Sequence, residues 1–184
     1  MMKLKINIFI VLIFFLGCSR DEGDFKDLPI AGSKNYFEFS WYGTKQIGTS
    51  SFDNASAVAT DSSGNVYLAG RTDGGLDGNS SAGDSDIFVI KYNSSGTKQW
   101  TKQLGTVSFD HASGVATDSS GNVYIAGGTR GGLYGNSNAG SSDIFVIKYN
   151  ASGTKQWTKQ LGTSHYDDST GVATDSSGNV YVAE

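Results

Sequence analysis

The ten-residue stretch VATDSSGNVY occurs three times in this chain, and successive copies are always 57 residues apart. Its copies occupy 58–67, 115–124 and 172–181. The surrounding unit repeats without a gap: 50–106 and 107–163 differ at only ten positions, and 164–184 begin a third copy. A period of this length indicates a fold of stacked supersecondary units, because one such unit cannot bury its apolar face alone.

Each unit contains four runs with the composition of β-strands. In the first copy they lie at about 55–61, 65–71, 86–93 and 97–105. The turns between them, DSSGN and NSSGT, share one design: an Asx side chain bonds the backbone two residues ahead, and Gly supplies the left-handed conformation. The recurring stretch is therefore predicted to be a hairpin. A structural role is predicted for its aspartates, Asp61, Asp118 and Asp175.

The third run, DIFVIKYN, is apolar on both of its faces, with Ile87, Phe88, Val89 and Ile90 in succession. A half-exposed strand alternates apolar and polar residues, so this strand is expected in a sheet covered on both sides. Four-stranded antiparallel sheets stacked radially meet that condition and form a β-propeller. A stacked β-solenoid is the alternative, but 57 residues is long for one solenoid rung, and the tight hairpins argue against parallel coils.

Two segments of the repeat, GVATDSSGNVYIAGGT and GSSDIFVIKYNASGTKQWTKQLGT, resemble the bacterial SBBP-type β-propeller repeat family. The resemblance covers 41–184 and lies in the D-x-x-G-N-V-Y-x-A-G core and the later D-x-F-V-x-K-Y run. It implies a propeller and a location in the cell envelope, and it implies no particular reaction.

The number of strands is too small for a closed ring. Residues 41–49 match the final strand of a copy, so 41–184 holds 11 strands, or about 2.75 blades. Propellers usually close with roughly 4–8 blades. We therefore predict an all-β, incomplete propeller whose DIFVIKY residues are partly exposed at both open ends. Truncation of a longer propeller is the favoured interpretation. The alternatives are a homo-oligomer formed through the open blade faces and pairing with another propeller protein.

The first residues have the features of an export signal. Residues 1–17 combine two lysines with the apolar run 6–16, which is shorter than the roughly 20 residues needed to span a membrane. Gly17 and Cys18, the only cysteine, follow this run and resemble a relaxed lipoprotein signal. Cys18 is thus the predicted lipid attachment site, and 18–40 include a tether. This predicts a lipid-anchored protein of the bacterial envelope, with the outer membrane or cell surface favoured. An ordinary signal peptide with an incidental cysteine is the alternative.

Charge and motifs exclude several classes of activity. The formal net charge is −4, whereas nucleic-acid binders are more often basic, so no nucleic-acid partner is predicted. Neither His111 nor His165 recurs in the other copies, and no nucleophile turn, phosphate loop or metal-ligand spacing is found. We therefore predict no catalytic residue, metal or cofactor, and a protein that is not an enzyme.

A calcium site is one hypothesis for the loop RTDGGLDGNSSAGDSD, because calcium prefers several oxygen ligands. Its carboxylates are Asp73, Asp77, Asp84 and Asp86. The second copy has Arg130, Tyr134, Ser141 and Asp143 in their places. This replacement argues against a calcium site in every blade and leaves open a single site in the first copy.

The differences between copies gather at one end of the blade. Six of the ten lie in the connections 49–54 and 72–85, and loops carry binding more readily than strands. Candidate binding residues are Asp73, Asp77, Asp84, Arg130, Tyr134 and Asn138. The alternative is that these loops tolerate sequence drift and have no binding role.

The predicted function is that of a non-catalytic envelope lipoprotein that binds an unknown protein or glycan through propeller loops. The alternative is a fragment of a propeller enzyme whose catalytic blades are missing.

Overall fold

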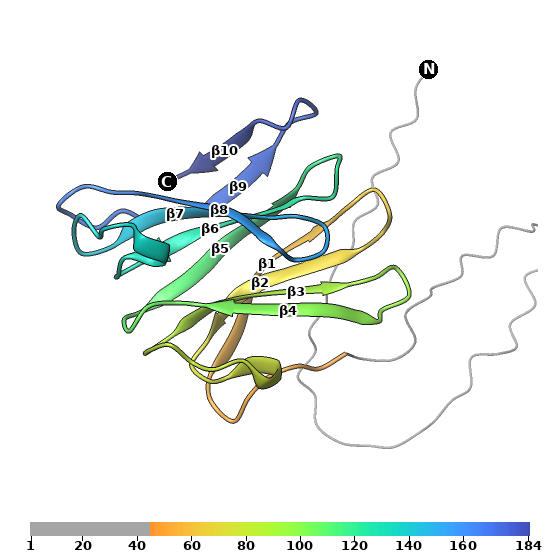
Figure 1. Ribbon diagram of the computed structural model, residues 1–184, viewed down its shortest axis with the longest axis horizontal. Helices are drawn as coiled ribbons and strands as arrows, with labels where there is room; N and C mark the ends of the chain where they lie inside the picture. The colour runs from red at the N-terminus through yellow and green to blue at the C-terminus, as the bar shows by residue number, and fades with distance from the viewer. Residues whose placement is uncertain (1–44) are drawn as a thin grey trace, which may run out of the picture. The chain divides into compact units, whose positions relative to one another are not determined.

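The computed structural model describes residues 45–184, which form two four-stranded antiparallel sheets and one hairpin (Figure 1). Blade 1 consists of β1 (Asp53–Thr60), β2 (Val66–Thr72), β3 (Asp86–Tyr92) and β4 (Lys98–Leu104), in that spatial order. Blade 2 repeats it with β5 (Asp110–Thr117), β6 (Val123–Thr129), β7 (Asp143–Tyr149) and β8 (Lys155–Leu161). A half-blade of β9 (Gly171–Thr174) and β10 (Val180–Ala183) follows.

This arrangement confirms the predicted all-β fold of incomplete propeller type. The four strands expected in the first copy are present, each within two residues of the predicted bounds. The first strands of successive units, β1, β5 and β9, lie next to one another. They are therefore the inner strands, and β4 and β8 form the outer edges of the blades. No helix in the described part of the chain is long and apolar enough to cross a membrane.

The recurring stretch forms the predicted hairpin. The Oδ1 atom of Asp61 accepts hydrogen bonds from the backbone N–H of Ser63 and of Asn65, at 2.9 and 3.0 Å. Its Oδ2 atom accepts hydrogen bonds from the Asn65 amide and the Tyr67 hydroxyl. Gly64 has φ 75°, the left-handed conformation that the turn requires. The same bonds recur around Asp118 and Asp175, so these aspartates are structural.

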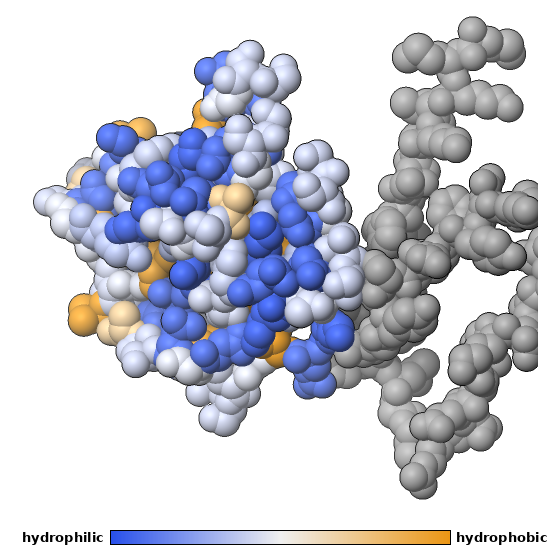
Figure 2. Space-filling model, turned by 45° about the vertical axis from the view of Figure 1, so that its right-hand side comes forward, coloured by the Kyte–Doolittle hydropathy of each residue, from blue (hydrophilic) through white to orange (hydrophobic). Residues whose placement is uncertain are grey.

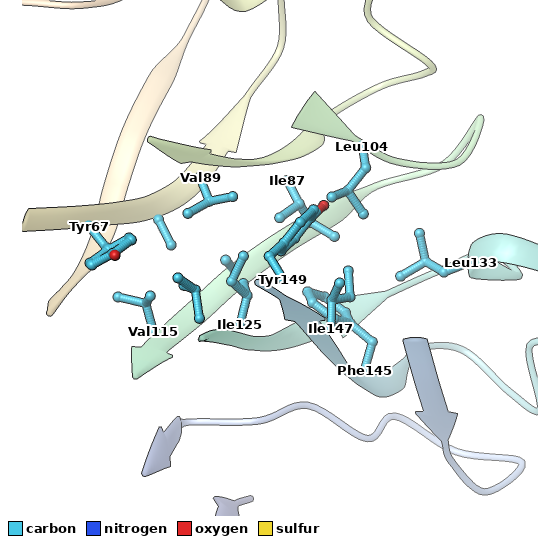
Figure 3. Close-up of a cluster of buried hydrophobic side chains, with 13 residues drawn as sticks. Tyr67, Ile87, Val89, Leu104, Val115, Ile125, Leu133, Phe145, Ile147 and Tyr149 are labelled. Atoms are coloured by element: carbon cyan, nitrogen blue, oxygen red, sulfur yellow. The ribbon is translucent and has the colours of Figure 1, made fainter. Parts of the chain in front are cut away.

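Blades 1 and 2 pack face to face across one apolar core (Figure 3). Because successive strand residues point to opposite faces, Ile87 and Val89 of β3 face blade 2, whereas Phe88 and Ile90 face the other way. Blade 2 contributes Ile125, Leu133, Phe145, Ile147 and Tyr149 to the same core. This burial on both sides of β3 explains why its sequence does not alternate.

The leading segment differs from the prediction. Residues 45–49, the described part of 41–49, form no strand, and 41–44 lie outside the described residues. Ile47 nevertheless packs against Leu76, Phe88, Ile90 and Tyr92 on the free face of blade 1. Its repeat equivalent is Leu104, which lies in the core among the matching residues of blade 2. The segment therefore covers blade 1 as an outer strand of a preceding blade would, without a strand partner of its own.

The expectation that DIFVIKY is partly exposed at both ends is wrong for the first copy. All seven residues of β3 are buried, because Ile47 and Leu76 cover the face that lacks a preceding blade. In β7 the residues Ile144, Val146 and Lys148 are only half-buried. Leu161, the repeat equivalent of Leu104, is 77% exposed. The open side of the described assembly is thus the C-terminal one.

Candidate functional site

The two ends of each blade have different characters. The tight turns between the first two and last two strands lie at one end, toward the right in Figure 1, and that end is mostly hydrophilic in Figure 2. The long β2–β3 and β6–β7 loops and the connections between blades lie at the other end. We call the latter the loop end, and six of the ten differences between copies belong to its connections.

Two equivalent aspartates, half-buried Asp53 and buried Asp110, fix the connections at the loop end. The Oδ2 atom of Asp53 accepts hydrogen bonds from the backbone N–H and the hydroxyl of Thr49, at 2.6 and 3.1 Å, and its Oδ1 atom accepts one from Thr72. Asp110 makes the same bonds with Thr106 and Thr129. Each aspartate therefore ties the segment that enters its blade to the end of the second strand.

Asp53 and Asp110 accept the same hydrogen bonds but differ in burial, and their pKa values shift in opposite directions. Burial raises the pKa of Asp53, but the bonds from Thr49 and Thr72 outweigh it and leave the pKa below its usual value. At Asp110 burial dominates over the bonds from Thr129 and Thr106, and the nearby Asp86 adds to it, so the pKa is raised. The difference follows from the position of the two strands: β5, which begins at Asp110, packs against blade 1, whereas β1, which begins at Asp53, belongs to the first blade that the structure describes.

A glutamine from the outer strand holds each long loop. The Gln103 side-chain amide donates to the Gly74 carbonyl and to Asp86, at 2.9 and 2.8 Å, and its carbonyl accepts the Leu76 N–H. Leu76 is thereby pressed into the core at the start of the short 3-10 helix η1 (Leu76–Gly78). Gln160 repeats these bonds around η2 (Leu133–Gly135). The loop backbones are therefore rigid frames, identical in the two copies.

Two of the six candidate residues lie away from the others. Asp77 and Tyr134 occupy one repeat position, and both have left-handed backbones, with φ 53° and 50°. Asp77 pairs with Lys98 of the outer strand at 2.6 Å and accepts the hydroxyl hydrogen of Thr101. Burial raises the pKa of Asp77, but the hydrogen bonds from Lys98 and Thr101 and the charge of Lys98 outweigh burial, so the pKa is below its usual value. The 3-10 turns thus fold back over the outer strands, and a single binding face of all six candidates is not formed.

The remaining candidates lie at the loop end with unequal roles. Asp73 accepts a hydrogen bond from the Ser85 hydroxyl at 2.7 Å, and Asn138 donates to the carbonyls of Arg130 and Gly140. Both side chains therefore brace the loop in which they stand. Asp84 is exposed. Arg130 is exposed and stacks on an aromatic ring, which connects it to the cluster described next.

Aromatic rings and guanidinium groups alternate at the loop end, where the inner strands begin. The Arg71 guanidinium lies 4.7 Å from the centre of the Phe52 ring and 4.8 Å from that of Phe109, so it is held between two rings. The Arg130 guanidinium lies 5.2 Å from the Phe109 ring centre. We call Phe52, Arg71, Phe109 and Arg130 the Arg–aromatic ladder; it spans the junction of blades 1 and 2.

The next junction carries a different polar pair. His111 Nε2 lies 3.1 Å from Asp168 Oδ2, which also accepts the Tyr166 hydroxyl hydrogen at 2.9 Å. A Cβ added to Gly128 would lie 2.6 Å from Asp168 Oδ1 and 2.9 Å from the His111 ring, so only glycine leaves room for the pair. Arg71 is the repeat equivalent of Gly128. The two junctions therefore use the same space for different groups.

The structure brings no metal site together. Among residues 45–184, no group of three or more His, Cys, Asp or Glu side chains is placed to hold a metal ion. The carboxylates weighed for calcium have separate partners: Asp73 bonds Ser85, Asp77 bonds Lys98, and Asp86 bonds Gln103. Cys18, the predicted lipid attachment site, lies outside the described residues.

Sequence reasoning missed the ladder, although part of its signal was present. Position 52 and its equivalents 109 and 166 are Phe, Phe and Tyr, so every copy has an aromatic residue there. Arg71 differs from its equivalent Gly128, a difference that stands at the end of a strand rather than in a loop. Only the packing of blade 2 on blade 1 brings Phe109 over Arg71.

Comparison with known proteins agrees with the repeat architecture. A family model described as SBBP, beta-propeller repeat, matches residues 43–77, 99–135 and 156–183. The regulatory protein FlaEY of Caulobacter vibrioides is 34% identical over 141 residues, which are 67% of this chain and 14% of that protein. An uncharacterised WD-repeat-containing protein of Acanthamoeba polyphaga mimivirus is 24% identical over 176 residues, 74% of this chain and 13% of its own length. The chain spans a small part of the length of both relatives. With three family matches distributed over its repeats, the chain belongs to the SBBP family of β-propeller repeat proteins.

Proposed function

We propose that this protein is a non-catalytic lipoprotein of the bacterial cell envelope whose propeller loops bind another envelope component. The observation that carries the proposal is the contrast between a constant frame and variable exposed side chains. The bonds of Gln103 and Gln160 are the same in both copies, whereas Asp73 is replaced by Arg130 on the same frame. A rigid frame that presents different side chains is suited to recognition, because little conformational entropy is lost on binding.

The lipid anchor is the second part of the proposal. It rests on the apolar run 6–16 followed by Gly17 and Cys18. A single lipid-modified N-terminal cysteine followed by the polar tether 19–40 would hold the blades close to a membrane. The outer membrane or cell surface is the favoured location within this proposal.

The relatives are consistent with binding rather than with a reaction. One is named a regulatory protein and the other a WD-repeat-containing protein. The feature closest to an active site is the His111–Asp168 pair, since a carboxylate orients histidine bases in many enzymes. The second nitrogen of His111, Nδ1, is buried, and among the described residues no group forms a hydrogen bond with it. The pair is therefore not arranged to activate a nucleophile of residues 45–184.

Two measurements test the proposal. In detergent-phase partitioning, the full-length protein should enter the detergent phase and Cys18→Ser should not; equal partitioning into water contradicts the anchor.

For binding, the tagged full-length protein is used to retrieve components of a solubilised envelope fraction. The exchange Asp73→Arg with Arg130→Asp should abolish retrieval of specific components, whereas Ser94→Ala, at the tight-turn end, should not. Retrieval that is insensitive to the loop-end exchange contradicts binding through the loops.

A further inference from the structure

We infer that the Arg–aromatic ladder binds the carboxylate groups of an acidic glycan. The inference rests on the proposed function, because it takes the loop end as the binding face, and it adds the site and the ligand class. The ladder was absent from the sequence-based candidates apart from Arg130.

Arg71 contacts two aromatic rings. Its guanidinium carbon lies 4.7 Å from the centre of the Phe52 ring and 4.8 Å from that of Phe109. A guanidinium carries its five N–H donors in its own plane, so stacking leaves the donor edge available. The Arg130 backbone N–H donates to the Phe109 carbonyl. No acceptor among residues 45–184 takes a hydrogen bond from the guanidinium group of Arg71 or Arg130. This edge has the planar fork geometry that binds a carboxylate through two parallel hydrogen bonds.

The nearby carboxylates of the described residues are already engaged. Asp168 bonds both His111 and Tyr166, and Asp73 bonds Ser85. Neither forms an ion pair with Arg71 or Arg130 among the described contacts. Two positive charges therefore flank one ring and neither has an ion-pair partner among the described residues, on a chain whose formal net charge is −4. Because the protein as a whole is acidic, a ligand whose negative charges contact only the ladder is favoured over one whose negative charges also contact the rest of the surface.

Exposed aromatic rings favour a sugar over a purely charged ligand. Phe52 is 51% exposed, at one end of the ladder, and Tyr166, its second repeat equivalent, is 56% exposed near Arg130. The C–H face of a sugar ring can bury apolar area on such a ring while its carboxylate reaches the adjacent guanidinium. A chain of uronic acid residues alternates these two surfaces, as the ladder alternates rings and cations. Since Arg71 and Arg130 both stack on Phe109, a short oligomer can reach both.

The site is single although the repeats are nearly identical. The equivalents of Arg71 and Arg130 are Gly128 and Asp73, so no other described junction carries this pair of cations. These equivalents also supply variants compatible with the fold, because the chain itself has Gly and Asp at the matching places. Arg71→Gly and Arg130→Asp therefore remove the ligand contacts with little risk to the blades.

The test is titration calorimetry of the full-length protein in detergent with a trigalacturonate or tetragalacturonate probe. Binding should be measurable and should weaken with added salt, and Arg71→Gly and Arg130→Asp should each weaken it at least about tenfold. Lys159→Gln, which removes one exposed positive charge from the outer strand β8, should leave the affinity unchanged. The methyl-esterified oligomer, which keeps the sugar and loses the charge, should not bind.

Three results would overturn the inference. They are equal binding of the methyl ester, equal binding of an oligoglutamate of the same charge, and unchanged affinity in Arg71→Gly. If no probe binds while envelope retrieval still depends on the loop end, the glycan inference fails and the proposed function stands. If the ladder variants alter neither the titration nor the retrieval, both fail.

Discussion

The junction between blades 1 and 2 and the junction between blade 2 and the half-blade have similar sequences and different burial. Leu104 is 7% exposed at the first junction, whereas its equivalent Leu161 is 77% exposed at the second. The side beyond the half-blade shows the same effect: Tyr124 of blade 2, which bonds Asp118, is 2% exposed, whereas Tyr181 of the half-blade, which makes the same bond to Asp175, is 58% exposed. Sequence therefore sets the local structure of each unit, and the neighbouring unit sets how much that structure is stabilised.

The largest expected difference concerns the two leucines. Leu104→Ala removes a side chain from the core of Ile87, Leu133 and Phe145 and should destabilise the protein by about 2–4 kcal/mol. Leu161→Ala should cost less than about 0.5 kcal/mol, because the side chain is mostly in water. Chemical denaturation of both variants measures the contrast. Equal costs would mean that Leu161 is covered by another part of the chain or by a second copy.

Substitution of a turn glycine should also cost more stability in the covered blade 2 than in the half-blade, by a smaller margin than for the two leucines. Gly121 has φ 74° in the covered blade 2, and Gly178 has φ 82° in the half-blade. A β-branched residue resists this conformation, so Gly121→Val should lower stability by about 1–2 kcal/mol. Gly178→Val strains a hairpin that contributes less to the cooperative core, and its effect should be smaller. Ser119→Ala, beside the same turn as Gly121, is the control; a thermal melt in which it ranks above Gly121→Val contradicts the turn assignment.

Asp53 and Asp110 should respond to pH in opposite directions. The pKa of Asp110 is raised by burial, so its contribution to stability is fully present below the unfolded-state value and is lost as pH rises through the folded-state value. The pKa of Asp53 is lowered in the folded state, so its contribution is present above the unfolded-state value and is lost as pH falls. The cost of Asp110→Asn should therefore shrink as pH rises, and that of Asp53→Asn should grow. Denaturation across pH 3 to about 7 measures both, and parallel trends would contradict the difference in burial.

The strands and tight turns were predictable because their signals are local. Two-residue alternation, Asx residues and turn glycines fix a hairpin within ten residues, and three identical copies made the pattern plain. The segment 45–49 was predicted as a strand from its match to 102–106, but a strand needs a partner that the described residues do not supply. The cover that Ile47 gives to blade 1 was missed for the same reason, since it depends on packing and not on local sequence.

The sequence indicated the end of the blade at which the candidate residues lie better than it indicated which residues lie together there. Variation between copies singled out Arg130, which lies at the loop end, whereas Asp77 and Tyr134 fold away because Gln103 and Gln160 fix the long loops. The ladder requires Phe109 of one unit to stack on Arg71 of another. A one-dimensional repeat pattern places both residues at blade ends, but their contact depends on the way in which successive blades face each other.

A substitution at the exposed C-terminal side of the molecule should change stability least and should still change self-association. Leu161, Tyr181 and Val182 are 77%, 58% and 39% exposed at the side where blade 2 and the half-blade lack further cover. β10 pairs only with β9, so its other edge also has free backbone groups among the described strands. Exposed apolar area beside an open strand edge favours contact with a second copy or another propeller.

Leu161→Lys should change stability by less than about 0.5 kcal/mol, because no buried contact is lost. It should also raise the monomer fraction in sedimentation velocity of the Cys18→Ser protein at several concentrations. Lys159→Gln, on the same strand, should leave the distribution as it is. Monomers alone in the Cys18→Ser parent would show that this side of the molecule is stable without a neighbour, and that the burial seen at Leu104 is not required at Leu161.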